Sequence, residues 1–147
     1  MIGEQIRSVK SSFNTHEVYE IYALCMYQPT WERFSAKAAA CMEDEGAEVF
    51  AFFQDDRMAG VIAVRRQSEE TAEILGIAVT PGLRGCGIGA KLIDFAEHKL
   101  ACGELLAETD DDAVVFYRKC GFETSAFLKN NAYRRYRCTR KSTNGER

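Results

Sequence analysis

The chain has 147 residues, of which 46% are hydrophobic and 28% are charged, a composition typical of one soluble globular domain. A domain of this size buries roughly two-thirds of its unfolded surface and needs no disulfide or metal to complete a core. No apolar run approaches the ~20 residues of a membrane span, and the first residues lack the apolar stretch of a signal peptide. We therefore expect one cytoplasmic domain over residues 1–140 and a disordered basic tail over residues 141–147.

The formal net charge of −3 conceals two regions of opposite sign. Residues 117–147 contain nine Lys or Arg and two Asp or Glu, whereas the preceding 116 residues contain ten and twenty. The acidic region favours a cationic substrate, and the basic region is of the kind that holds phosphates or nucleic acid. Two solvated surfaces of opposite sign would explain the same pattern.

The six cysteines form neither a metal-binding nor a disulfide pattern. No pair has C-x-x-C spacing, and the two histidines, His16 and His98, are isolated. Zinc sites need clustered ligands, and cysteines in a chain without a secretion signal most simply pack as small apolar side chains. We therefore expect no metal cofactor.

Hydrophobic periodicity, capping residues and turn residues predict the secondary structure. Thr15 can cap a first helix whose apolar face includes Tyr22 and Cys25, and Pro29 interrupts it. The predicted strands are 5–9, 48–53, 58–64, 72–79, 104–108, 122–127 and 133–138, and the later helices are 30–42, 88–100 and 112–119. Strands 48–53 and 58–64 are apolar on both faces, which implies a sheet with helices on both sides. The order β-α-α-β-β-β-α-β-α-β-β predicts a mixed α/β domain.

The most informative segment is the glycine-rich turn between strand 72–79 and helix 88–100. Glycines at positions 85, 87 and 89 let the backbone take positive φ and approach a ligand closely, and free amides at a helix start suit an anion such as a pyrophosphate. Arg84 adds a permanent positive charge. The turn is therefore a candidate phosphate cradle.

Two nucleotide-binding motifs compete for this turn. The P-loop string G-x-x-x-x-G-K-[ST] is absent. The dinucleotide fingerprint G-x-G-x-x-A is matched by Gly85, Gly87 and Ala90, with Glu108 at the end of the next strand, so a dinucleotide-binding protein stays an alternative. However, residues 80–84 separate the strand from the first glycine, and about half the chain precedes the motif.

Two segments resemble motifs of the Gcn5-related N-acetyltransferase (GNAT) superfamily. Ile77-Ala78-Val79-Thr80-Pro81 followed by Arg84-Gly85-Cys86-Gly87-Ile88-Gly89 is similar to the family's acetyl-CoA motif, a strand followed by [RQ]-x-x-G-x-[GA]. The segment from Asp110 to Phe122 is similar to N-x-x-A-x-x-F-Y-x-K-x-G-F. The resemblance covers about residues 5–138 and implies a sheet in which the strands ending near Val79 and Asp110 splay apart.

The resemblance also implies how the co-substrate, acetyl-CoA, is held. Its pantetheine would lie between the splayed strands and its pyrophosphate on the amides of residues 85–90. The implied cofactor-binding residues are Ile77, Ala78, Val79, Arg84, Gly85, Cys86, Gly87, Ile88, Gly89, Ala90, Asp110 and Phe116. Asp110 stands where many members have Asn, and an ionised carboxylate accepts a hydrogen bond but does not donate one. The hydrogen bond that the Asn side-chain amide of those members donates to the cofactor arm is therefore not expected from Asp110.

Acetyl transfer to an amine poses two proton problems. An alkyl ammonium titrates near ~10.4 and must lose a proton before it attacks, and the leaving thiolate, from a thiol titrating near ~8.5, needs a proton or a hydrogen bond. Tyr117 is the candidate acid, because Phe116, Tyr117 and Cys120 share the inward face of a helix and the family's tyrosine at this position points at the thioester sulfur. An ordinary packing role for Tyr117 is the alternative.

Glu73 is the candidate base. A carboxylate within a strand is unusual unless it meets water or a cation, and the segment from Glu73 to Val79 matches the histone-acetylating branch, in which this glutamate is the base. A solvated charge at the strand entry is the alternative, and Glu108 and Asp110 stay open as members of a water relay. A covalent route through Cys86 lacks an activating histidine in either motif.

The family resemblance also implies where the acceptor binds. The loop 26–31 and the turn 128–133 would form two of its walls, with Tyr27, Trp31 and Tyr133 as candidate substrate-binding residues. Aromatic rings can stack on or cage an ammonium, although they also serve as ordinary packing. We expect a small-molecule or peptide amine as the partner, and neither nucleic acid nor membrane. Polyamines, aminoglycosides, amino acids and protein lysines all remain open.

Two further classes of protein remain alternatives. A non-catalytic acyl-CoA sensor would use the same cradle without turning over any amine. A nucleic-acid binder would show a strongly salt-dependent affinity. It would use the basic residues Lys129, Arg134, Arg135, Arg137, Arg140 and Lys141. Because these alternate along a predicted strand, they do not form one continuous face.

Overall fold

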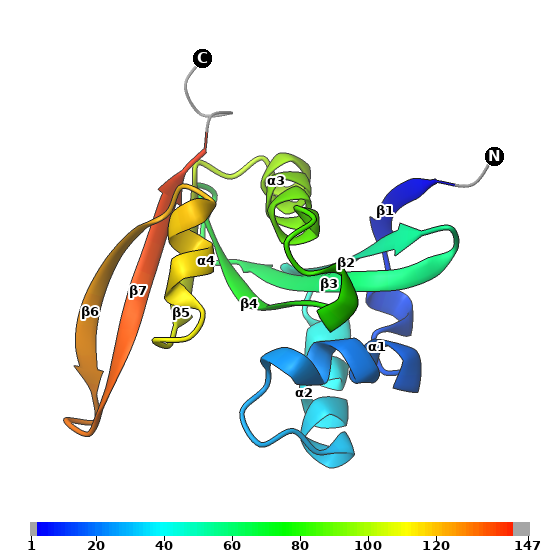
Figure 1. Cartoon of the computed structure of the whole chain (residues 1–147), viewed down its shortest axis with the longest axis horizontal. Coiled ribbons are helices and arrows are strands. Elements are labelled where there is room, and N and C mark those ends of the chain that lie inside the picture. Colours follow the sequence, from blue (N-terminus) through cyan, green and yellow to red (C-terminus); the bar gives the residue numbers. More distant parts are fainter. Residues whose placement is uncertain (1–2, 143–147) are drawn as a thin grey trace.

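The computed structural model describes residues 3–142, and its elements follow the predicted order (Figure 1). The strands are β1 (Glu4–Ser8), β2 (Ala47–Gln54), β3 (Arg57–Arg66), β4 (Thr71–Val79), β5 (Glu104–Thr109), β6 (Glu123–Lys129) and β7 (Tyr133–Lys141). The α-helices are α1 (His16–Tyr22), α2 (Trp31–Glu43), α3 (Ile88–Leu100) and α4 (Val114–Lys119), and the 3-10 turns are η1 (Lys10–Ser12), η2 (Ala23–Cys25) and η3 (Pro81–Leu83). Over the described residues, no helix is long and apolar enough to cross a membrane.

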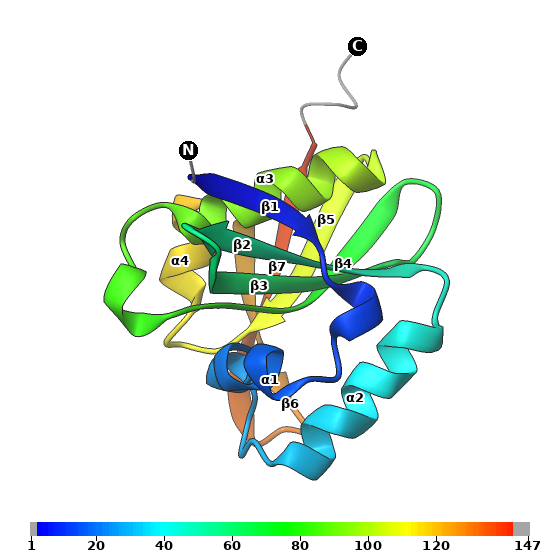
Figure 2. The ribbon, with the colours of Figure 1, turned by 90° about the vertical axis from the view of Figure 1, so that its right-hand side faces the viewer.

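One seven-stranded sheet runs through the molecule in the order β1-β2-β3-β4-β5-β7-β6. All neighbouring strands are antiparallel except β4 and β5, which are parallel. Helix α3 covers one face of the sheet, and α1 and α2 cover the other (Figures 1 and 2). The predicted mixed fold is confirmed. The mostly antiparallel sheet differs from the parallel, doubly wound sheet that the dinucleotide alternative requires.

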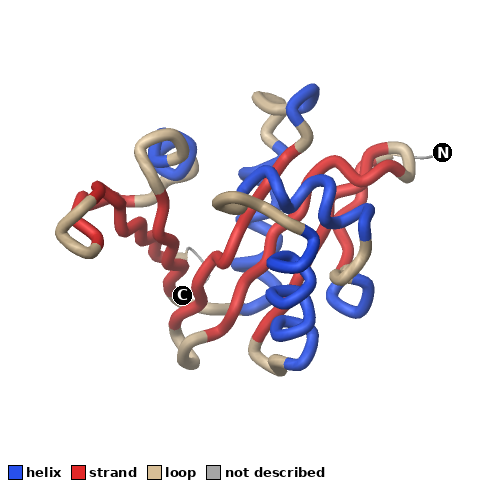
Figure 3. The backbone as a smooth tube through the Cα atoms, turned by 90° about the horizontal axis from the view of Figure 1, so that it is seen from below, coloured by secondary structure: helices blue, strands red, loops and turns tan. Residues whose placement is uncertain are grey.

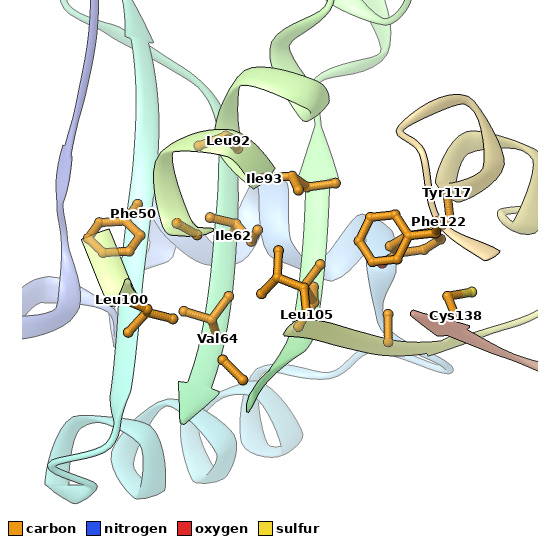
Figure 4. Close-up of a cluster of buried hydrophobic side chains, with 14 of the residues drawn as sticks. Phe50, Ile62, Val64, Leu92, Ile93, Leu100, Leu105, Tyr117, Phe122 and Cys138 are labelled. Atoms are coloured by element: carbon orange, nitrogen blue, oxygen red, sulfur yellow. The ribbon is translucent and has the colours of Figure 1, made fainter. Parts of the chain in front are cut away.

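Strands β2 and β3 separate two hydrophobic cores. Their central residues are buried on both faces, as the apolar hairpin predicts. The buried side chains on the α3 side include Phe50, Ile62, Val64, Leu92 and Ile93 (Figure 4). Those on the α1–α2 side include Val18, Phe34, Val49, Val61 and Ala63. Helix α4 extends the first core over β5 and β7, where Tyr117, Phe122 and Cys138 meet (Figure 4).

Threonine side chains cap the starts of α1 and α2. The Thr15 hydroxyl accepts a hydrogen bond from the Val18 amide, and α1 then continues as the 3-10 turn η2. Helix α4 begins two residues later than its predicted start at residue 112. The reason is that the Asp110 carboxylate accepts hydrogen bonds from the amides of Asp112 and Ala113, at 3.1 and 3.0 Å, and so holds a turn there.

The last strand is longer than the sequence predicts. β7 continues to Lys141, and the buried Ser142 donates its amide to the Gly103 carbonyl at 2.8 Å. The rest of the predicted tail, residues 143–147, lies outside the described residues.

Candidate active site

The candidate site begins where two neighbouring parallel strands separate. β4 and β5 pair over only three positions, from Thr71–Glu104 to Glu73–Leu106. Beyond them the two halves of the sheet diverge (Figure 3), which is the predicted splaying. The stretch 74–79 of β4 therefore has a strand partner on its β3 side and none on its β5 side. A strand edge of this kind offers free N–H and C=O groups to a ligand.

The glycine-rich turn continues from this open edge into α3. Gly85 (φ +86°) and Gly87 (φ +82°) adopt the left-handed conformation that favours glycine. Gly87 directly precedes the 13-residue helix α3 and gives it no side-chain cap. The first helical amide to find a backbone acceptor is that of Lys91, which donates to the Gly87 carbonyl at 3.0 Å. The preceding amides, of residues 88–90, are the free donors expected at a helix start and suit an anion.

The second predicted motif contacts the first through Phe116. A Cβ atom placed on Gly89 would lie 2.8 Å from the Phe116 ring, so the start of α3 meets α4 closely only because residue 89 has no side chain. Arg84 stays exposed, and its Nε atom donates to the Val79 carbonyl at 3.2 Å. The structure thus brings together the two segments that the sequence singles out.

Tyr117 lies on the inward face of α4. It is only 6% exposed, and its ring meets Phe116 and Phe122 edge-on, each at 5.2 Å between centroids. Burial raises the pKa of its phenol, so the hydroxyl stays protonated near neutral pH. Among residues 3–142 this hydroxyl has no hydrogen-bond partner. It is nevertheless not completely enclosed, because that part of the chain leaves no fully buried side-chain oxygen without a partner.

Tyr22 and Cys25, which the sequence places only on the apolar face of the first helix, lie against the open part of β4. The Tyr22 ring covers Gly76 of β4 so closely that a Cβ there would lie 2.3 Å from the phenol oxygen. Cys25 lies beside the Ile77 amide. Ionisation of Cys25 would raise the pKa of Tyr117, and ionisation of Tyr117 would raise the pKa of Tyr22. Cys25 keeps an accessible surface, yet the protein around its thiol raises its pKa to about 12, chiefly through desolvation. The available sequence signal was Gly76, since a glycine inside a strand often marks close approach of another group.

The candidate carboxylates differ in their partners. Glu73 is partly buried where β4 and β5 still pair, and it accepts a hydrogen bond from Gln67 Nε2 at 3.0 Å. Glu108 accepts from Lys129 Nζ at 2.8 Å and from Arg135 Nε at 2.9 Å. The hydrogen bond from Lys129, together with that from Arg135, lowers the pKa of Glu108, which makes it a weaker base.

The predicted acceptor aromatics do not form one cluster. Trp31 stacks on His16 at 4.0 Å between ring centroids and also meets Tyr19 and Phe34. Tyr27 is 83% exposed and Tyr133 is 50% exposed. Within the described residues no ring contact joins Tyr133 to either of the others.

Four of the basic C-terminal residues are paired with acids from the preceding part of the chain. Lys129 and Arg135 pair with Glu108, Arg134 pairs with Asp111, and Arg140 pairs with Glu97 and Asp94. The opposite charges of the two regions therefore meet in part inside one fold. No group of three or more His, Cys, Asp or Glu able to hold a metal occurs among the described residues. A surface depression lined by Ile6, Phe50 and Phe95 lies elsewhere, between β1 and α3.

Taken together, the sheet that opens between β4 and β5, the uncapped glycine turn at one end of the opening and the buried phenol across it define a class of protein. They are the arrangement expected of a transferase that binds an extended, diphosphate-bearing acyl carrier of the CoA type.

The chain belongs to the acetyltransferase (GNAT) family, whose profile matches residues 15–122. The fold is shared with aminoglycoside 6'-acetyltransferase type Ii, at a TM-score of 0.77 and 16% identity over 93% of this chain and 96% of that one. Ard1 from Thermoplasma volcanium matches at a TM-score of 0.72 and 22% identity, over 95% and 98% of the two chains. A Bacillus subtilis acetyltransferase solved with CoA matches at a TM-score of 0.68 and 18% identity, over 97% and 99%.

A search of curated proteins found no match. At these low identities the structural likeness shows the fold alone, and it is membership of the family that supports an acetyl-CoA-dependent acetyltransferase.

Proposed function

We propose that the chain is an N-acetyltransferase that moves the acetyl group of acetyl-CoA to a primary amine by direct attack in a ternary complex. The observation that carries the proposal is that β4 and β5 part beyond Glu73 and Leu106, which leaves one edge of β4 open, while Tyr117 of α4 keeps a hydroxyl without a hydrogen-bond partner among the described residues. In this arrangement the amine attacks the thioester carbon between the strands, a tetrahedral intermediate forms, and its collapse releases the CoA thiolate.

Binding of the cofactor comes first in the proposal. The edge of β4 from Ile77 to Val79 would hold the pantetheine amides, and the free amides of residues 85–90 would hold the pyrophosphate, assisted by Arg84. A thermal-shift panel of acetyl-CoA, CoA, NADH and ATP tests this step. A ligand at 100 times its Kd adds ~2.7 kcal/mol of stability, which raises the Tm of a chain of this length by roughly 5–10 °C. We expect that shift with acetyl-CoA and CoA only, and a shift with NADH alone would contradict the cradle assignment.

Tyr117 is the proposed acid. Its raised pKa keeps it a phenol, so it can donate a hydrogen bond to the departing thiolate. Tyr117→Phe should lower kcat by about 100-fold or more and leave acetyl-CoA affinity nearly unchanged. The matched control is Tyr136→Phe, because the Tyr136 hydroxyl donates to Asp111 on the solvent side of α4. Unchanged turnover in Tyr117→Phe would remove this residue from the mechanism.

Glu73 is the proposed base, accepting a proton from the ammonium directly or through water. Glu73→Gln should remove the acidic limb of the pH–rate profile, while the stability of the protein changes little because the replaced carboxylate accepts only one hydrogen bond from a neutral amide. A profile identical to that of the wild type would exclude Glu73. Binding of acetyl-CoA without turnover of any amine would instead identify a non-catalytic acyl-CoA sensor.

A further inference from the structure

One face of the hairpin half of the sheet carries an unusual set of charges. Side chains alternate along each strand, so the face opposite α4 holds Glu108 of β5, Lys129 of β6, and Arg135 and Arg137 of β7. We call these four residues the basic face. The two ion pairs of Glu108 confirm that they lie together, and Cys138, which points to the other side, is buried beneath α4.

The basic face adjoins the open edge of β4. Leu106 pairs with Glu73 where the strands still meet, and Glu108 follows two residues later on the same face of β5, beside the divergence. The same side of the sheet carries α1 and α2 on its other half. An amine that approaches the opening from this side therefore passes over Glu108 and its neighbours.

The charges on this face do not cancel. Its single carboxylate is shared between Lys129 and Arg135, at 2.8 and 2.9 Å, which leaves an excess of two positive charges among the four residues. The positive charge is therefore local to these four residues and lies next to the Glu73 carboxylate on the same side of the sheet, an arrangement that suits an acceptor with a carboxylate as well as an ammonium.

Arg137 is the cation of this face that is held in place without a counter-ion. Its guanidinium carbon lies 4.0 Å from the centre of the Phe127 ring, a stacked geometry, and Arg137 itself is exposed. Among residues 3–142 it has neither an ion pair within 4.0 Å nor a hydrogen bond from its side chain. A stacked guanidinium keeps its N–H edge free, and that edge fits a carboxylate through two parallel hydrogen bonds.

We propose that the acceptor is a small primary amine that also carries a carboxylate, and that Arg137, stacked on Phe127, binds this carboxylate while the amine reaches the thioester. The inference rests on the proposed acetyl transfer and names the substrate class for it. Arg137 acts here as a specificity-determining residue: it fixes the acceptor and takes no part in the proton transfers.

The test uses matched amines. A series of ω-amino carboxylates of increasing chain length is compared, at saturating acetyl-CoA, with the carboxamide and the diamine of equal length. We expect kcat/KM for the best carboxylate to exceed that of its carboxamide by about tenfold or more, the effect of one charge-assisted pair. Arg137→Gln should remove this preference by raising KM for the carboxylate, and kcat/KM for the carboxamide should stay the same. Arg137→Lys should retain part of it.

The control is Arg134→Gln, three positions away on the same strand. Arg134 is exposed but lies on the opposite face, paired with Asp111 at 3.0 Å, so its replacement should leave the preference intact. A preference for the carboxamide or the diamine, or one that survives Arg137→Gln, would overturn the inference while leaving acetyl transfer standing.

A second readout applies if acetyl-CoA binds but no amine is turned over. The CoA-loaded protein should then be stabilised in thermal unfolding by the carboxylate and not by its carboxamide, and this difference should vanish in Arg137→Gln. Equal or absent stabilisation would overturn the inference. If acetyl-CoA itself fails to bind, the proposed function fails first, and the two failures are thereby distinguished.

Discussion

Gly76 is the position at which the fold depends most directly on a missing side chain. A Cβ there would lie 2.3 Å from the Tyr22 hydroxyl oxygen and 2.6 Å from the ring carbon that bears it, whereas carbon atoms pack at ~3.5–4.0 Å. Tyr22 is 5% exposed, and its ring is confined by Phe13 and Phe34, with centroids at 5.4 and 6.0 Å. Gly76→Ala must therefore displace a core ring by about 1 Å or push β4 away from α1.

Overpacking of this kind costs ~1–3 kcal/mol, and we expect the upper end because both partners lie in the core. For a chain of this length, about 3 kcal/mol lowers Tm by roughly 10 °C. Urea and thermal unfolding measure the loss. Tyr22→Phe removes the nearest atom, so Gly76→Ala and Tyr22→Phe together should destabilise less than the sum of the two changes, with a coupling of about 1 kcal/mol.

The control is Gly82→Ala, in the 3-10 turn η3 that follows β4. Its added Cβ would meet nothing within 4 Å, so stability should stay within ~0.5 kcal/mol of the wild type. The reasoning is refuted if Gly76→Ala is as mild as Gly82→Ala, or if its effect is additive with that of Tyr22→Phe.

Two further predictions concern ion pairs. Arg140→Met leaves the Glu97 carboxylate, which is 8% exposed, without its partner at 2.8 Å, and urea unfolding should show a loss of ~3–5 kcal/mol; a loss as small as the ~0–1 kcal/mol expected for the exposed Arg134 pair would contradict this. Glu108 has a lowered pKa, so its pairing stabilises the fold above the ordinary glutamate value of 4.5, and this contribution disappears as the pH falls through the lowered pKa. The Tm deficit of Glu108→Gln should accordingly be largest near neutral pH and shrink toward zero in acid, and a deficit independent of pH would count against the pairing.

The sequence predicts most of the elements because their signals are local. Caps, apolar periodicity and glycine turns lie within a few residues of what they determine, so Thr15 marks the start of α1 and Gly87 the start of α3. The two motifs also predict that strands near Val79 and Asp110 part. Misplaced boundaries have equally local causes, such as the Asp110 carboxylate that delays α4.

The convergence of side chains could not be predicted in the same way. Tyr22 and Cys25 read as an ordinary apolar helix face, and only the three-dimensional path brings them to Gly76 and to Tyr117, about ninety residues later in the chain. The local distribution of charge could not be predicted either, for a related reason. The summed charge of the first 116 residues favours a cationic acceptor. On the hairpin, however, Glu108 is paired with both Lys129 and Arg135, so the charge of the basic face is positive.

The same pairing narrows the proposed route of the amine proton. Glu108 is held by two cations that lower its pKa, and the Asp110 carboxylate accepts two amides of the turn before α4. Glu73 accepts one side-chain hydrogen bond, from the neutral Gln67 amide, and has no cationic partner among the described residues. Of the three carboxylates, it is therefore the one best able to accept a proton. It also lies on the face opposite α3, whereas Tyr117 comes from the side of α4. The two proton events of the reaction would then occur on opposite faces of the opened sheet. The ammonium would lose its proton on the side from which it approaches, and the thiolate would receive its hydrogen bond on the other.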